Sequence, residues 1–162
     1  MSREEEFVKK LEERFGRRVR DPRIQRARRI FVEIDGKDLR EVLTYVKNEL
    51  GFDHISAITG LDVGEDIELI YHVAYENSIE LSIKTKVSKK DPRIDTVADI
   101  YDPAGIYERE VHDLLGVVFE GNPDLSPLLL PDDWPSGVYP LRKDKSFEEL
   151  RELVEKSGVS GK

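Results

Sequence analysis

The apolar residues of this chain change their spacing along its first third. In residues 4–15 they recur every three or four positions and Gly16 follows them, which predicts a short amphipathic helix. Residues 29–34 alternate with the period of two that is typical of a strand. Residues 37–50 return to a helical stripe, and Gly51 follows it as a helix C-terminal signal. The chain is therefore predicted to open with a helix, a strand and a second helix.

Three further strands are predicted in the middle of the chain, at residues 54–63, 67–75 and 79–87. The gaps between them, at 64–66 and 76–78, are short and rich in turn-forming residues, which favours antiparallel hairpins. Strands joined by hairpins, with helices before and after them, indicate an α+β fold and not a doubly wound one. We expect a mainly antiparallel sheet of about four strands with flanking helices.

The second half of the chain begins with two helical patterns, at residues 95–101 and 103–115, the second with a proline at its first turn. A short strand is predicted at 117–119. A last helix is predicted at 146–156, where a serine and a glutamate stand at the spacing of a capping box.

Between these last two elements the chain holds five prolines, at positions 123, 127, 131, 135 and 140. Proline fixes φ and removes a backbone donor, so this stretch is predicted to form neither a long helix nor a central strand. It is nevertheless rich in apolar side chains, which disordered segments lack. We therefore expect an extended arm that is ordered by lying on another surface, either its own domain or a partner. The predicted divisions are an N-terminal helix and basic linker (1–29), an α+β core (30–119) and a docking arm with a C-terminal helix (120–162).

Composition narrows the possible functions. At 162 residues the length suits one domain, and there is no cysteine, so the chain has no thiolate for an iron–sulfur cluster or for nucleophilic catalysis. No run of 18 apolar residues is present and the N-terminus lacks an apolar segment, so we expect a cytoplasmic protein without a membrane span. Charged residues make up 37%, while Met, Gln and Asn are scarce, which indicates a thermophilic source.

The net charge of −8 is unevenly distributed. Residues 1–29 contain 11 Lys and Arg against 6 Asp and Glu, a local +5, which leaves −13 for residues 30–162. The basic run at 17–29 is compatible with nucleic-acid binding. However, no aromatic residue lies within it for base stacking, and the acidic remainder would repel phosphates, so a solvated basic face or an acidic neighbour is favoured.

The residues that could carry chemistry form no complete site. Glu108 and His112 stand four apart on one predicted helical face, but two ligands are too few for a metal, so we expect neither metal nor cofactor. An acid and base pair could come from the acidic residues between 108 and 133, which leaves a free-standing hydrolase as an alternative. For Arg109 the spacing favours a bidentate pair with Asp113, or else a solvated charged face. Trp134 could fill a partner's pocket or pack on its own domain.

A longer set of motifs stands in a fixed order between positions 108 and 144. They are Glu108-Arg109-Glu110, Asp113, Gly116, Phe119, Pro123-Asp124-Leu125, Leu129-Leu130, Asp133-Trp134 and Pro140-Leu141-Arg142-Lys143-Asp144. In order and spacing this set resembles the 30 kDa subunit of respiratory complex I and its hydrogenase relatives. The version at 137–144, Gly-Val-Tyr-Pro-Leu-Arg-Lys-Asp, is similar to the membrane-bound energy-converting [NiFe] hydrogenase branch.

The resemblance implies a non-catalytic structural subunit, without cofactor, in the cytoplasmic arm of a membrane-bound, ion-pumping redox complex. The implied complex is a ferredoxin-oxidising, hydrogen-evolving hydrogenase, with a sulfane sulfur reductase or a quinone-reducing complex I as alternatives. The implied partners are the large hydrogenase-type subunit and the small iron–sulfur subunit, with membrane subunits touched only indirectly and nucleic acid not at all. The residues expected at the partner interface are Glu108, Arg109, Glu110, Asp113, Pro123, Asp124, Leu125, Leu129, Leu130, Trp134, Pro140, Leu141, Arg142, Lys143 and Asp144.

Overall fold

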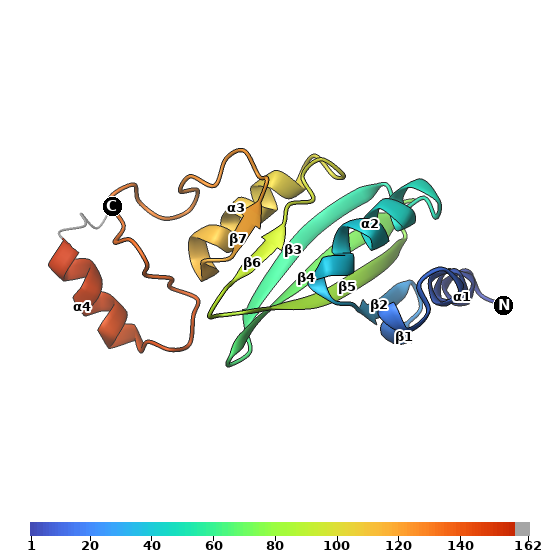
Figure 1. Cartoon of the computed structure of the whole chain (residues 1–162), viewed down its shortest axis with the longest axis horizontal. Helices are drawn as coiled ribbons and strands as arrows, with labels where there is room; N and C mark the ends of the chain where they lie inside the picture. Colours follow the sequence, from blue (N-terminus) through green and yellow to red (C-terminus); the bar gives the residue numbers. More distant parts are fainter. Residues whose placement is uncertain (158–162) are drawn as a thin grey trace.

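The computed structural model describes residues 1–157 and confirms the α+β class (Figure 1). The helices and strands are α1 (Arg3–Phe15), β1 (Arg20–Arg26), β2 (Arg29–Glu33), α2 (Leu39–Asn48), β3 (His54–Asp62), β4 (Asp66–Tyr75), β5 (Ile79–Ser88), β6 (Arg93–Asp95), α3 (Ala104–Leu115), β7 (Val118–Glu120) and α4 (Phe147–Ser157). Short 3-10 turns, η1 (Gly16–Arg18) and η2 (Gly36–Asp38), precede β1 and α2.

The main sheet has five strands in the order β1-β2-β5-β4-β3. The β3–β4 and β4–β5 hairpins are antiparallel as predicted, but β2 runs parallel to β5, with Ile30 opposite Leu81. The prediction of about four mainly antiparallel strands was therefore wrong in number and in one pairing. The missed strand is β1, which lies in the stretch assigned to a basic linker. It has no apolar alternation because it is an edge strand exposed on both faces.

One face of this sheet carries the hydrophobic core. Inward residues alternate along β4 and β5, and they form a single cluster with apolar residues of α1, α2 and α3. The buried apolar residues on this face of the two strands are Ile67, Leu69, Tyr71, Val73, Ile79, Leu81, Ile83 and Val87. Gly60 of β3 lies directly under α3, since a Cβ there would approach the side chain of Leu115 to 2.6 Å. This close contact fixes α3 across the end of the sheet.

A second, two-stranded sheet pairs β6 with β7 in parallel. The helix predicted over residues 95–101 is absent. Its apolar residues Val97, Ile100 and Tyr101 are buried, but they form one turn closed by the bonds from Ile100 and Tyr101 to the carbonyl of Val97. Pro103 follows, and the residue before a proline is disfavoured in a helix, so the turn does not continue.

Residues 121–146 form neither helix nor strand, as predicted. They do not extend away from the domain, however. The chain runs back along α3 before it leaves the body at α4, so the prediction of an extended arm is not supported (Figure 1). The last five positions of the predicted arm, 158–162, lie outside the described residues.

Candidate protein-binding surface

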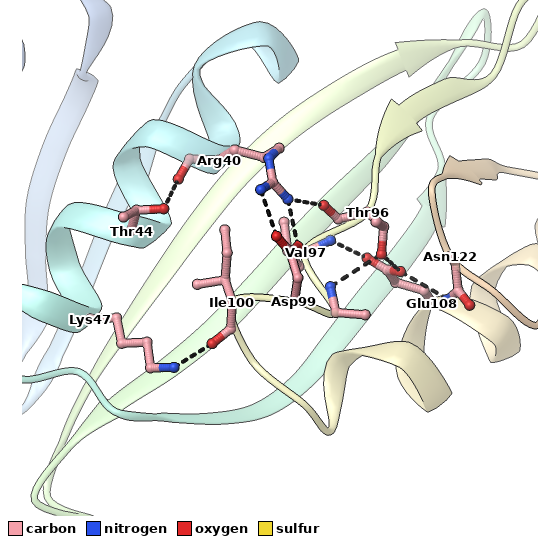
Figure 2. Close-up of polar contacts among 10 residues, drawn as sticks. Arg40, Thr44, Lys47, Thr96, Val97, Asp99, Ile100, Glu108 and Asn122 are labelled. Carbon is pink, nitrogen blue, oxygen red and sulfur yellow. Dashed lines mark hydrogen bonds and ion pairs between the residues drawn. The ribbon is translucent and has the colours of Figure 1, made fainter.

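Glu108 joins three parts of the chain at the buried face of α3. Its carboxylate is fully buried and accepts hydrogen bonds from the Thr96 hydroxyl, from the Val97 amide at 2.8 Å and from the Asn122 side-chain amide at 3.0 Å (Figure 2). Burial raises the pKa of Glu108, and these three donors oppose that rise. The result is a link between α3, the turn after β6 and the first residues of the C-terminal segment.

The same region is tied to α2 by a second set of polar contacts. The guanidinium of Arg40 makes a two-point pair with Asp99, at 2.7 and 2.8 Å, and donates to the Thr96 carbonyl at 2.7 Å (Figure 2). Lys47 donates to the carbonyl of Ile100. These bonds hold the turn between β6 and α3, so Thr96 presents its hydroxyl to Glu108.

Asp113 holds the leucine run of the C-terminal segment. Its Oδ2 accepts the backbone amides of Leu128, Leu129 and Leu130 at 3.3, 2.8 and 2.9 Å. Three donors on one nearly buried oxygen form an anion-binding loop of the kind that consecutive amides create. Because the amides point inward to Asp113, the backbone of the leucine run is fixed against α3.

Arg109 has different partners from those predicted. Its Nε donates to the carbonyl of Ser126 at 2.6 Å and its Nη2 to that of Pro127 at 2.7 Å, while Nη1 lies 3.6 Å from a carboxylate oxygen of Asp124. The predicted bidentate pair with Asp113 was therefore wrong. The two side chains instead act side by side: Arg109 binds carbonyls and Asp113 binds amides of the same segment.

The segment also closes the C-terminal end of α3. Helix ends leave carbonyls without partners, and here Leu141 donates its amide to the Leu114 carbonyl at 3.1 Å and Arg142 donates Nε to the Leu115 carbonyl at 2.8 Å. Gly116 makes this approach possible: its φ is +78°, and a Cβ would lie 2.5 Å from the ring of Tyr139.

Asp62, at the end of β3, anchors the next residue of the segment. Its buried carboxylate accepts the Lys143 amide at 2.7 Å and the Gly64 amide at 2.9 Å, and it pairs with the ammonium of Lys89. Burial opposes ionisation, but Lys89 and the two amides outweigh it and lower the pKa of Asp62 to about 2. The Oδ1 of Asp144 lies 3.8 Å from the Nζ of the same Lys89.

Two apolar side chains of this clamped segment are exposed, while Leu125 packs against the core and Val138 is buried. Leu129 is 58% exposed and Leu141 is 53% exposed, although the backbone at both positions is hydrogen-bonded to the domain. In α4, Phe147 is 79% exposed and no residue is buried, while Phe147, Leu150 and Val154 share one face at helical spacing. Apolar groups are thus displayed on a backbone that polar bonds hold in place.

Trp134 packs within its own segment. Its indole Nε1 donates to the carbonyl of Val138 at 2.8 Å, and its ring lines a cavity of about 250 Å³ together with His112 and Asp113. Arg142 is likewise engaged inside the chain, because its guanidinium stacks on Tyr139 in addition to bonding α3. Both residues have internal partners that the sequence did not reveal.

The predicted chemical candidates are not assembled into one site. Glu108 and His112 bind different groups, since the Nδ1 of His112 donates to the Val117 carbonyl at 2.8 Å. Glu108 and Asp113 are both occupied by hydrogen bonds, and Glu110 is exposed on another side of α3. Within residues 1–157, no three His, Cys, Asp or Glu side chains lie close enough together to hold a metal ion.

Sequence reasoning missed Asp62, Thr96 and Asn122. For Asp62 a signal was present: it follows Ile58 and Gly60 at the inward positions of β3, so an acid at that position had to be either buried or at the end of the strand. Glu108 gave a similar signal, because it falls in the stripe of buried residues on α3. No local pattern marks Thr96 or Asn122.

Comparisons with known proteins agree on one family. A family model described as the 30 Kd subunit of the respiratory-chain NADH dehydrogenase matches residues 32–150. A subunit of the F(420)H(2) dehydrogenase of Methanosarcina mazei is 35% identical over 141 residues, which cover 85% of this chain and 89% of that protein. A subunit of the NADH-quinone oxidoreductase of Chloroherpeton thalassium is 36% identical over 126 residues, or 74% of this chain, which spans about half (52%) of that relative.

Solved structures give the same result. A chain of the membrane-bound sulfane sulfur reductase, an archaeal respiratory membrane complex, matches with a TM-score of 0.83 and 32% identity, covering 98% of this chain and 93% of that one. A trypsin-resistant fragment of Nqo5 matches with a TM-score of 0.62 and 27% identity, covering 74% of this chain and 98% of the fragment.

Fold and surface define a small α+β protein whose C-terminal segment is clamped to its domain while apolar side chains of that segment stay exposed. The chain belongs to the family of the 30 kDa subunit of the respiratory-chain NADH dehydrogenase and is thus a subunit of a complex I-related respiratory complex. In the part of the chain that the structure describes, no helix is long and apolar enough to cross a membrane.

Proposed function

We propose that this chain is a non-catalytic structural subunit in the cytoplasmic, peripheral arm of a membrane-bound, ion-pumping redox complex, and that its C-terminal segment binds a large hydrogenase-type subunit. The small iron–sulfur subunit is proposed as a neighbour, with membrane subunits touched only indirectly. Electron transfer would then belong to the other subunits, since this chain has no cysteine for cluster ligation.

One observation carries this proposal: the backbone of the C-terminal segment is hydrogen-bonded to the domain while the side chains of Leu129 and Leu141 remain exposed. Ordering a flexible loop on binding costs conformational entropy, and Asp113 and Arg109 have already restricted the leucine run before a partner arrives. The exposed side chains of Leu129 and Leu141 therefore offer contact area that needs little further ordering.

α4 supports the same interpretation. It has 11 residues, and isolated helices of this length are marginal in water. None of its residues is buried, and Figure 1 shows the helix set apart from the main sheet. A partner surface that buries Phe147 would supply the packing that the helix lacks.

Two features bear on which complex this subunit serves. The motif at residues 137–144 supports a ferredoxin-oxidising, hydrogen-evolving [NiFe] hydrogenase. The structural match over nearly the whole chain favours the alternative, a complex of the sulfane sulfur reductase type. The proposed role is the same in both, because the terminal acceptor is bound elsewhere. The hydrolase alternative is disfavoured, since two of its acids, Glu108 and Asp113, are occupied by structural hydrogen bonds and Glu110 lies on another side of α3.

The test is a double charge substitution, Leu129→Asp with Phe147→Asp, in a tagged chain expressed in its source cells. Both side chains are exposed, so the melting temperature of the isolated chain should change little, while the amount of co-purifying large subunit should fall sharply. Leu61→Asp is the matched control, because Leu61 is 46% exposed and its side chain lies on the face of β3 opposite Asp62, the residue that binds the segment. Full co-purification of the double variant would contradict the proposed binding surface.

A further inference from the structure

A second charged surface lies at the other end of the molecule. Residues 1–29 carry +5 while the rest of the chain carries −13, and all eight basic residues between positions 14 and 29 are arginines. Figure 1 shows α1, β1 and β2 at one end of the long axis and α4 at the other. The surface is therefore well separated from the C-terminal segment to which the proposed function is assigned.

β1 is an unusual strand because it buries no side chain. Of its seven residues only Pro22 is partly covered, and the strand pairs with β2 on one side only. Strands normally gain stability by packing one face on a core, and β1 does not. β1 therefore adds backbone pairing to the edge of the sheet but no buried side chain to the core.

Half of the arginines in this region are neutralised within the chain. The pairs are Arg14 and Arg18 with Glu41, Arg20 with Asp35, and Arg29 with Glu80. Among the described residues no ion pair is found for Arg17, Arg23, Arg26 or Arg28. The Arg23 guanidinium is held over the ring of Phe31, 5.4 Å from its centroid. Four exposed arginines therefore remain without an ion pair at this end of the sheet. Arg17 lies in η1, Arg23 and Arg26 lie in β1, and Arg28 lies in the turn to β2, where its amide donates to the Glu4 carboxylate at 2.7 Å.

The edge of β1 is not suited to accepting another strand. Pro22 removes a backbone donor, the pairing with β2 is irregular at two places, and Asp21 has a φ of +47°. These are the devices by which edge strands avoid main-chain pairing. A partner at this edge would therefore be recognised by arginine side chains.

We propose that the four arginines Arg17, Arg23, Arg26 and Arg28 form a second docking surface, and that its partner is an acidic protein surface. Arginine forks bind carboxylates in two-point pairs, which explains the use of arginine without lysine. A cluster of carboxylates bound here would interact electrostatically mainly with these four arginines, because charges farther than about 8 Å away are screened at physiological salt. A long polyanion or an anionic membrane would also meet the acidic remainder of the chain, and no aromatic residue in 17–29 offers base stacking.

The first test uses the assembled complex and zero-length cross-linking. Arg23→Lys and Arg26→Lys keep the charge and introduce an amine, which a carbodiimide joins to a carboxylate in contact with loss of water. We expect peptides in which positions 23 and 26 are linked to Asp or Glu of another subunit. Links to this chain alone, or none, from a complex that has assembled would overturn the proposal. If no other subunit co-purifies with the wild-type chain, the result contradicts the proposed function and not this second docking surface.

The second test reverses the charge. Arg23→Glu with Arg26→Glu should reduce the amount of co-purifying partner about tenfold at physiological salt, a change of about 1.4 kcal/mol, and the wild-type contact should weaken as salt rises. Lys86→Glu with Lys90→Glu is the control, since it makes the same charge change at two exposed positions near the end of β5. An unchanged yield would overturn the proposal. So would binding of the isolated wild-type chain to phosphatidylglycerol–phosphatidylcholine vesicles or to a short duplex DNA that the Arg23→Glu, Arg26→Glu variant loses.

Discussion

The five-stranded sheet and the segment after β7 are stabilised in opposite ways. In the sheet the inward side chains of β4 and β5 are almost fully excluded from water, and apart from Thr85 the polar side chains of these strands lie on the other face. In residues 121–146 only Val138 is buried, and the main attachments are hydrogen bonds in which backbone amides donate to carboxylates and backbone carbonyls accept from arginine. Apolar burial holds one region, and a small number of polar clamps holds the other.

This difference has a functional consequence. A segment that was held by burying its own leucines would have no apolar surface left for a partner. By attaching the backbone through Asp113, Arg109 and Asp62, the molecule keeps Leu129 and Leu141 exposed in a defined position. Segments held by few contacts also open more readily than a core, so we expect the two regions to differ in local stability.

The largest effect should come from the sheet. Leu81 lies fully buried in β5, between β2 and β4, and Leu81→Ala should lower the free energy of unfolding by about 3 kcal/mol through lost burial and a residual cavity. The measurement is urea denaturation of the isolated chain. Leu129→Ala is the matched control in the segment and should change the value by less than about 0.5 kcal/mol. Equal losses would mean that the segment contributes to the core.

A smaller effect should follow from protonation of Asp62. Its pKa is about 2 in the folded chain, below the ordinary value of 3.8, so its contribution is complete above about pH 4 and is lost as the pH falls through about 2. A shift of this size corresponds to about 2 kcal/mol. Asp62→Asn should therefore be less stable than the wild type at pH 6, and the difference should shrink as the pH falls from about 4 through 2.

The control for this experiment is Asp53→Asn, which changes an exposed aspartate just before β3. Other carboxylates titrate in the same range, so the informative quantity is the difference between wild type and variant at each pH, measured by urea denaturation. A constant difference across the range would show that Asp62 acts through its shape and not through its charge.

How far the sequence predicted the fold depended on burial. α2 and the hairpins of β3, β4 and β5 were predicted because each buries one face, and burial imposes a period. β1 was missed because it buries nothing. Residues 95–101 were predicted as a helix because Val97, Ile100 and Tyr101 have helical spacing, and they do form one turn. Spacing alone does not show that Pro103 ends that turn.

The sequence singled out several residues of the candidate surface but did not predict which groups they bind. Arg109 and Asp113 were selected, but they bind backbone groups of residues 126–130 and do not pair with each other. A side-chain bond to a distant main chain leaves no trace in local sequence, since any residue offers an amide or a carbonyl. The role of the exposed leucines as a partner interface remains a prediction.

The smallest effect on global stability, and the sharpest contrast between the two regions, is expected from Asp113→Ala. The substitution removes the acceptor of the amides at Leu128, Leu129 and Leu130. These amides are near the surface, so the segment can open to water and avoid the penalty of buried unsatisfied donors; the global free energy of unfolding should fall by only about 1 kcal/mol. Hydrogen exchange of the three amides should nevertheless accelerate at least tenfold, the equivalent of about 1.4 kcal/mol of local protection, while amides of β4 and β5 stay protected. Glu110→Ala, on an exposed turn of the same helix, is the control and should leave both quantities unchanged. If exchange accelerated equally in the sheet and in the segment, the two regions would unfold as one unit, and the polar clamps would be part of the core's cooperativity.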